Sequence, residues 1–230
     1  MAEVAEKDIV VKKAKEPLFS KKNRKLVTDP LADNNPITIQ VLGICSALAI
    51  TAQLKAAIVM AISVTFVLSI GNVVISLMRN IIPPKIRIIV QLVVAAALVI
   101  IVDLVLKTYA YPLSKQLSVF VGLIITNCII MGRFEAFALG NSPWKSFLDG
   151  VGNGAGYGLI LIIVAFFREL LGSGTLLGFK VLGDSVDKTG LYALGYENNG
   201  FMLLSPMALI VVGLIIWVQR SRNKALIEEH

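Results

Sequence analysis

Six apolar runs, separated by polar segments, follow a polar stretch that covers residues 1–35. Because a helix rises about 1.5 Å per residue, a hydrocarbon core of about 30 Å needs roughly 20 residues. The second and third runs meet that length, and the fifth and sixth meet it once flanking residues are added. The pattern predicts an all-α polytopic membrane protein with six transmembrane helices. The runs are Ile37–Thr51, Ala56–Leu77, Ile86–Leu106, Leu117–Met131, Tyr157–Leu171 and Phe201–Val218.

The first and fourth runs are too short to cross a membrane as regular helices. Each has roughly 15 continuous apolar residues, which span only about 22 Å as helix. Each is followed by a polar break, Gln53–Lys55 after the first and Gly132-Arg133 after the fourth. Short, interrupted segments at matching places in two halves are typical of inverted repeats with a functional site near the midplane. We therefore predict two inverted three-helix halves, residues 36–106 and 116–218, each opening with a short or broken helix.

Composition and charge place the chain in lipid. Apolar residues make up 56% of it and charged residues 16%, with a mean hydropathy of +0.78. Soluble domains carry about 25% charged residues. The net charge of +7 does not indicate nucleic-acid binding, because Lys and Arg are concentrated in the tail and beside the apolar runs, the pattern of loops at an anionic lipid surface. Sixteen of the 22 basic residues fall on the side of the N-terminal tail, which predicts cytoplasmic termini.

Three regions follow from this pattern. Residues 1–35 are expected to form a mobile, polar cytoplasmic extension with at most a short helix near Asp8–Lys15. Residues 36–220 are expected to form the membrane domain, and residues 221–230 a cytoplasmic C-terminal tail.

The two cysteines are the candidate functional residues. Cys45 lies nine residues, about 14 Å, beyond the start of the first span, and Cys128 lies twelve residues, about 18 Å, beyond the start of the fourth. Because the two spans enter from opposite faces, both thiols are expected near the middle of the bilayer. Thiolates are soft ligands for iron or zinc. Two thiolates cannot complete a four-thiolate iron–sulfur site, so a partner chain would have to supply the other two. The alternative is that both cysteines are small packing residues.

Other polar and small residues carry weaker signals. The glycine run Gly150–Gly158 lacks the strand and the Lys-Ser/Thr pair of a phosphate-binding loop, and its spacing favours close helix packing. Arg168-Glu169 is expected to mark the exit of the fifth helix. Asp103 is expected to pair with Lys107 one turn later, with cation passage as its less favoured role.

Several longer segments together point to a known family. They are Asn35-Pro36, Gln40–Thr51, Arg87–Gln91, Ser114–Arg133, Glu135–Phe137, Asp149–Asn153, Phe166–Gly174 and Phe201–Leu204. Through these segments nearly all of the chain, from Asn34 to Arg220, resembles the D-type membrane subunits of bacterial sodium-translocating NADH:quinone reductases, in the NqrDE/RnfAE family. The Rnf-type E subunits share the Thr-Asn-Cys-Ile core at Cys128 but are less similar around Gln40–Thr51 and Ser114–Leu123.

The resemblance implies that Cys45 and Cys128 bind a 2Fe–2S cluster together with two cysteines of a homologous membrane subunit of the E type. It further implies a multi-subunit complex of the bacterial inner membrane, with FAD, FMN and riboflavin in other subunits. In such a complex, electrons pass from NADH to ubiquinone while sodium is exported. On this reading the chain is one component of an NADH:quinone reductase and has no complete active site of its own.

Three alternatives stay open at this point. The chain could be an Rnf-type electron-transfer subunit, a small secondary transporter for an ion or solute, or an assembly scaffold.

Overall fold

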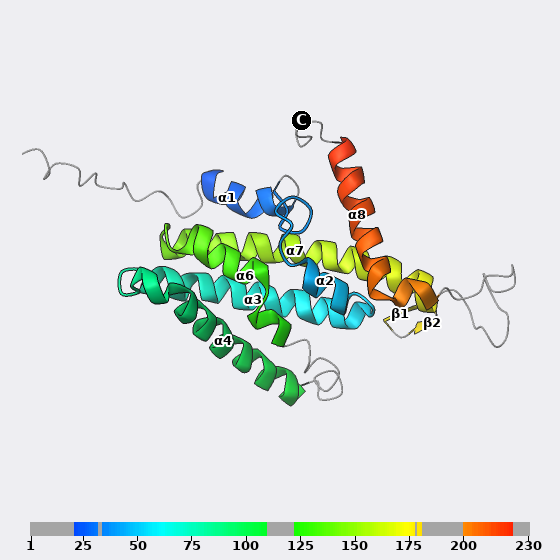
Figure 1. Cartoon of the computed structure of the whole chain (residues 1–230), viewed down its shortest axis with the longest axis horizontal. Coiled ribbons are helices and arrows are strands. Elements are labelled where there is room, and N and C mark those ends of the chain that lie inside the picture. The colour runs from blue at the N-terminus through cyan, green and yellow to red at the C-terminus, as the bar shows by residue number, and fades with distance from the viewer. Residues whose placement is uncertain (1–20, 32–33, 110–121, 178, 181–199, 223–230) are drawn as a thin grey trace, which may run out of the picture.

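A computed structural model describes residues 21–31, 34–109, 122–177, 179–180 and 200–222 of the chain. These residues form helices apart from one short antiparallel ribbon (Figure 1). The predicted helix near Asp8–Lys15 lies outside the described residues. The long helices are α3 (Leu54–Met78), α4 (Arg87–Tyr109), α7 (Pro143–Ser173) and α8 (Ser205–Arg222). The shorter elements are α1 (Lys21–Thr28), η1 (Asp29–Leu31), α2 (Ile44–Ile50), η2 (Pro84–Ile86), α6 (Cys128–Arg133), η3 (Phe134–Ala138), β1 (Thr175–Leu176), β2 (Phe179–Lys180) and η5 (Gly200–Leu203).

Three of the described helices are long and apolar enough to cross a membrane. They are Leu54–Met78, Pro84–Thr108 and Pro143–Ser173, and Ser205–Ser221 forms a shorter apolar helix. The described parts of the first and fourth apolar runs form short helices, α2 of 7 residues and α6 of 6 residues, which extends past the fourth run to Arg133. The helix is interrupted between α2 and α3, next to the expected break at Gln53–Lys55. The break expected at Gly132-Arg133 is wrong, because α6 continues there directly into η3 and the buried Asp149 carboxylate binds the Arg133 side chain. The inverted relation between the two halves stays a prediction.

The α7 helix is much longer than the predicted run Tyr157–Leu171. It begins at Pro143, where a proline in the first turn needs no hydrogen-bond partner for its nitrogen. It ends at Gly174, whose left-handed backbone, with φ 69°, is typical of a helix C-terminus. The glycine-rich stretch before Tyr157 is therefore helical, although glycine disfavours a helix by about 1 kcal/mol relative to alanine.

Close packing of α7 against α3 explains why those glycines are helical. A Cβ on Gly154 would lie 2.7 Å from the Thr65 Cα, so only glycine lets the two backbones come this close. Residue numbers rise along α3 while they fall along α7, so the helices run antiparallel; Figure 1 shows them side by side. We call these contacts the glycine seam; they pair Gly150 with Ser69, Gly154 with Thr65 and Gly158 with Ala61. The preference for close packing over a phosphate loop is confirmed.

The alternate glycines of the same stretch receive the N-terminal segment. Gly152 faces the backbone of α1, and Gly156 lies against the Pro30 carbonyl in η1. The Asn35 side-chain amide donates to the Gly156 carbonyl at 3.0 Å. The expectation of a mobile extension is therefore wrong for the described part of residues 21–35, because glycines on a second face of α7 leave room for this backbone.

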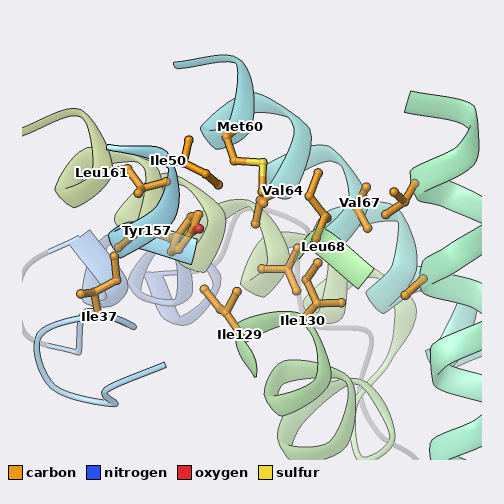
Figure 2. Packing of buried hydrophobic residues seen from close by; sticks show 14 of the residues in the cluster. Ile37, Ile50, Met60, Val64, Val67, Leu68, Ile129, Ile130, Tyr157 and Leu161 are labelled. Carbon is orange, nitrogen blue, oxygen red and sulfur yellow. The ribbon is translucent and has the colours of Figure 1, made fainter. Parts of the chain in front are cut away.

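Helices α2, α3, α6 and α7 share one apolar core. Figure 2 shows buried residues of these helices meeting in a single cluster, with ten of them labelled. Ile37 comes from the turn before α2. Tyr157 brings its hydroxyl oxygen, drawn in red, into the cluster. The core therefore lies directly beside the two short helices that carry the cysteines. The remaining labelled residues are Ile50, Met60, Val64, Val67, Leu68, Ile129, Ile130 and Leu161.

Candidate functional site

Cys45 is the second residue of α2, just after a sharp backbone turn. Gly43 precedes the helix with φ 80°, and Val41 has φ 58°. A positive φ is rare for a residue with a branched Cβ and carries a cost of about 1–3 kcal/mol, so surrounding contacts must hold this turn in place. The Ser46 hydroxyl supplies one such contact, because it donates to the Gly43 carbonyl at 2.8 Å.

Cys128 is the first residue of α6 and also follows a break. Residues 122–125 are helical, and the helix is interrupted at Thr126 and Asn127. The Asn127 side-chain oxygen then accepts the Ile129 N–H at 3.4 Å, which caps the new helix. The two cysteines therefore occupy similar local positions, each at the start of a short helix after an interruption.

The two breaks lie against each other. The Asn127 side-chain amide donates to the Ser46 hydroxyl oxygen at 3.2 Å. Leu42 packs over Gly132, where a Cβ would come within 3.2 Å of its side chain. Ser46 directly follows Cys45 and Asn127 directly precedes Cys128, so the fold brings the two cysteine-bearing segments together. The expected common depth of the two thiols in the bilayer stays a prediction.

Tyr157 of α7 joins both segments. Its hydroxyl lies 2.6 Å from the Ser46 hydroxyl, and the Asn127 amide donates to it at 3.4 Å. Its ring lies against Gly43, where a Cβ would come within 2.9 Å of a ring carbon. We call Ser46, Asn127 and Tyr157 the polar triad. Their side chains are 1%, 1% and 0% exposed.

In contrast to this buried triad, both cysteines are exposed and neither forms a disulfide. The two residues directly after each cysteine are buried; they are Ser46 and Ala47 in α2 and Ile129 and Ile130 in α6. Each short helix therefore turns its core-facing residues inward and leaves its cysteine available at the surface of this chain.

The donor set fits half of an iron–sulfur site. Within the described residues no group of three or more His, Cys, Asp or Glu is close enough to hold a metal ion. The whole sequence contains two cysteines and one histidine, His230. A four-thiolate cluster at Cys45 and Cys128 would therefore take its other two ligands from a second chain.

Arg168 and Glu169 attach the ends of neighbouring elements to α7. Both are buried, with 1% and 6% exposure. Arg168 donates to the Thr51 hydroxyl at the end of α2 and to the carbonyls of Met202, Leu203 and Leu204 before α8. The Glu169 carboxylate accepts the Leu54 N–H at the start of α3.

The expectation that this pair marks the exit of a helix is thus incomplete. The two side chains face the protein interior, where they hold three helix ends.

Two further ionic groups connect helices near the candidate site. Arg133 at the end of α6 binds the buried Asp149 carboxylate of α7 through two nitrogens, one of them at 2.9 Å. Glu135 pairs with Arg87 and accepts the Gln91 amide at 3.0 Å, which joins η3 to α4.

Asp103 lies elsewhere, on α4. It pairs with Lys107 at 2.6 Å, as its spacing predicted.

The sequence identifies both cysteines and, as their small or polar neighbours, Gly43, Asn127 and Gly132. It does not show the contacts that these neighbours make, nor the roles of Ser46 and Tyr157. Tyr157 stands at the edge of an apolar run. The one sequence feature that could have marked it is its position within the glycine-rich stretch that packs closely on α3.

Comparisons with known proteins identify the family of the chain. A family model described as an Rnf-Nqr subunit, membrane protein, matches residues 23–216. The D subunit of the Na(+)-translocating NADH-quinone reductase of Proteus mirabilis is 54% identical over 210 residues, which cover 91% of this chain and 98% of that protein. The D subunit of the same reductase from Haemophilus influenzae strain PittGG is 58% identical over 196 residues, which cover 85% of this chain and 92% of that protein. These relatives are components of an oxidoreductase complex.

Proposed function

Because this chain belongs to the Rnf-Nqr family of membrane subunits, we propose that it relays electrons inside a sodium-translocating NADH:quinone reductase. Cys45 and Cys128 supply two of the four thiolates of a 2Fe–2S cluster within the bilayer. A homologous membrane subunit of the E type supplies the other two. The complex lies in the bacterial inner membrane and couples NADH oxidation and quinone reduction to sodium export.

One observation carries this proposal: two exposed thiols stand on short helices whose preceding breaks touch each other. The link is the 3.2 Å hydrogen bond from Asn127 to Ser46, one residue away from each cysteine. Packing cysteines would be expected in the core, where the neighbouring side chains of both helices lie. Exposure beside a buried triad instead favours a ligand role at a contact with another chain.

The bound cluster would supply one-electron redox chemistry, which no side chain of this protein provides. The chain holds the two thiolates at the starts of two adjoining short helices on its surface, where the partner subunit would complete their surroundings. NADH oxidation and quinone reduction belong to other subunits, which carry FAD, FMN and riboflavin. In the same proposal the chain spans the membrane as two inverted halves with both termini in the cytoplasm.

The test uses the purified complex with Cys45→Ser and Cys128→Ser introduced separately. We expect each variant to lose iron, acid-labile sulfide and one 2Fe–2S signal in electron paramagnetic resonance (EPR) spectra, because a serine hydroxyl is a poor ligand for iron. NADH-driven quinone reduction should fall to near background. Ser63→Ala is the matched control: it removes a buried hydroxyl whose hydrogen bond goes to Val59 in its own helix.

Three results would contradict the proposal. Unchanged iron and sulfide in both cysteine variants would show that neither cysteine of this chain binds a cluster. Full quinone reduction by both variants would favour an assembly scaffold. Solute uptake by the chain expressed alone, unaffected by either substitution, would favour a secondary transporter. A fourth result would change only the type of complex. If electrons enter from ferredoxin and not from NADH, the chain still relays electrons but belongs to an Rnf-type complex.

A further inference from the structure

The hydrogen bonds of the polar triad have a single consistent direction. Ser46 donates its one hydroxyl hydrogen to the Gly43 carbonyl, which can only accept. The 2.6 Å contact between the Ser46 and Tyr157 hydroxyls must then use the Tyr157 hydrogen. Tyr157 therefore donates to Ser46, and Ser46 donates to the turn that precedes Cys45.

Asn127 closes the arrangement from the other cysteine-bearing segment. Its amide nitrogen donates to Ser46 at 3.2 Å and to Tyr157 at 3.4 Å. Its side-chain oxygen accepts the Ile129 N–H, at the start of the helix that carries Cys128. One connected, uncharged network thus runs from the Gly43 carbonyl through Ser46 and Tyr157 to the first turn of α6.

Tyr157 is the member of this network that comes from a third element. It belongs to α7, which is fixed to α3 by the glycine seam. Its ring edge lies against Gly43 in the turn before Cys45, and its hydroxyl contacts Ser46, the residue directly after Cys45. A rigid helix therefore provides the reference point for two short helices, neither of which is long enough to be stable alone.

We propose that Tyr157 is a positioning residue for the metal site, whose hydroxyl sets the separation of the two cysteine-bearing turns and thereby the redox properties of the cluster. This inference rests on the proposed function of Cys45 and Cys128. The groups that orient metal ligands tune the metal as well as hold it. Hydrogen bonding and burial around a cluster are among the factors that set its reduction potential.

The decisive variant is Tyr157→Phe in the complete complex. It removes one oxygen and keeps the ring over Gly43, so iron and sulfide content should match the unmodified complex. We expect the EPR line shape and the midpoint potential of the cluster to change, because the two turns lose their common partner. Electron transfer from NADH to quinone should fall by about tenfold, at the low end for residues that support metal ligands.

Ser46→Ala tests the same hydrogen bond from its other end while leaving the tyrosine in place. It should change the spectrum and potential in the same sense. The double variant should change them little more than the stronger single variant, because both substitutions break one shared interaction. The control Ser63→Ala, with a hydroxyl bonded inside α3, should leave spectrum, potential and rate unchanged.

The inference fails if Tyr157→Phe and Ser46→Ala retain full iron together with the unmodified spectrum, potential and rate. If Tyr157→Phe loses iron through misfolding, Ser46→Ala decides: an altered potential supports the inference and an unaltered one overturns it. Failure of the proposed function has a different result, since Cys45→Ser would then keep the cluster signal.

Discussion

At the scale of single residues, the site depends on a backbone conformation that most side chains disfavour. Gly43 has φ 80°, and the nearest ring carbon of Tyr157 leaves no room for a Cβ. Glycine meets both demands, because it adopts positive φ freely and lacks a side chain. The hydrogen bond from Ser46 to the Gly43 carbonyl then stabilises the turn. Residues without redox chemistry of their own thus decide where the Cys45 thiol lies.

Gly43→Ala is expected to destabilise this turn and the metal site with it. The strained φ and the 2.9 Å approach to Tyr157 should together cost about 1–3 kcal/mol. We expect a lower unfolding temperature of the purified complex and reduced iron content.

Gly213→Ala is the matched control for that substitution. Gly213 lies in α8 with no atom near the added methyl group and a φ outside the left-handed region. This variant should be neutral or slightly stabilising. Equal behaviour of the two variants would contradict the role given to Gly43.

At the scale of elements, short helices are held by a long one. The α2 helix has 7 residues, too few to persist without tertiary support. Its end is bound through Thr51 to Arg168 of α7, and the start of α3 is bound through Leu54 to the adjacent Glu169. The α7 helix therefore supports both ends of the turn between α2 and α3.

Arg168→Leu is expected to lower stability strongly. It leaves the carbonyls of Met202, Leu203 and Leu204 without this donor, and an unsatisfied buried acceptor costs about 1–3 kcal/mol. Arg168→Lys should rescue only partly, because an ammonium group cannot reach all the acceptors of a guanidinium fork.

Thermal unfolding of the complex measures the loss. Arg79→Leu is the comparison, since Arg79 is exposed and its described bond goes to one carbonyl, that of Asn141. A loss for Arg168→Leu no greater than for Arg79→Leu would show that the buried arginine is dispensable.

The glycine seam yields a third prediction. Gly154→Ala places a methyl group 2.7 Å from the Thr65 Cα, where backbone rather than a flexible side chain must move. Separation of α3 and α7 should cost about 1–3 kcal/mol, the usual penalty for overpacking. We expect less assembled complex in membranes and a lower unfolding temperature, whereas a variant as stable as Gly213→Ala would exclude tight contact at this position.

At the scale of the whole molecule, the chain builds a core of its own but only part of a site. Its core connects α2, α3, α6 and α7, while its two thiols stay exposed. The α4 helix is also largely uncovered, because only 22% of its most apolar stretch of 18 residues is buried within this chain. Lipid or other subunits must cover these surfaces.

Thiol labelling of whole membranes tests this incompleteness. Without its partner subunits, the chain should react at both Cys45 and Cys128 with a membrane-permeant maleimide, since both residues are exposed. In the assembled complex the same residues should react severalfold more slowly. Cys45→Ser and Cys128→Ser identify which thiol gives each signal, and equal rates in the two states would show that no partner covers them.

Sequence patterns predict what repeats along the chain and miss what depends on tertiary contact. The long apolar runs and the close-packing glycines follow from local spacing, whereas the interruptions that precede Cys45 and Cys128 lie inside apolar runs and were not expected there. Tyr157 could not be singled out, because its role depends on a hydrogen bond to Ser46, 111 residues away. The part of α7 that precedes Gly154 was not expected to be helical, because its polar residues and glycines disfavour a helix that packing against α3 stabilises.

The docking of the N-terminal segment was missed for a similar reason. Its polar composition indicated solvent, but Gly152 and Gly156 open a face of α7 that accepts its backbone. Glycines that alternate along a helix can therefore serve two partner surfaces at once.

The side-chain polar groups of the polar triad form hydrogen bonds within this chain. This affects the order in which membrane insertion and assembly with a partner can occur. A newly inserted chain exposes no polar atom of Ser46, Asn127 or Tyr157 to hydrocarbon. The groups left open are two thiols, which behave as small hydrophobes and tolerate acyl chains as temporary neighbours. The protein can therefore fold in the membrane first, and under the proposed function iron would be delivered only after the partner subunit has bound.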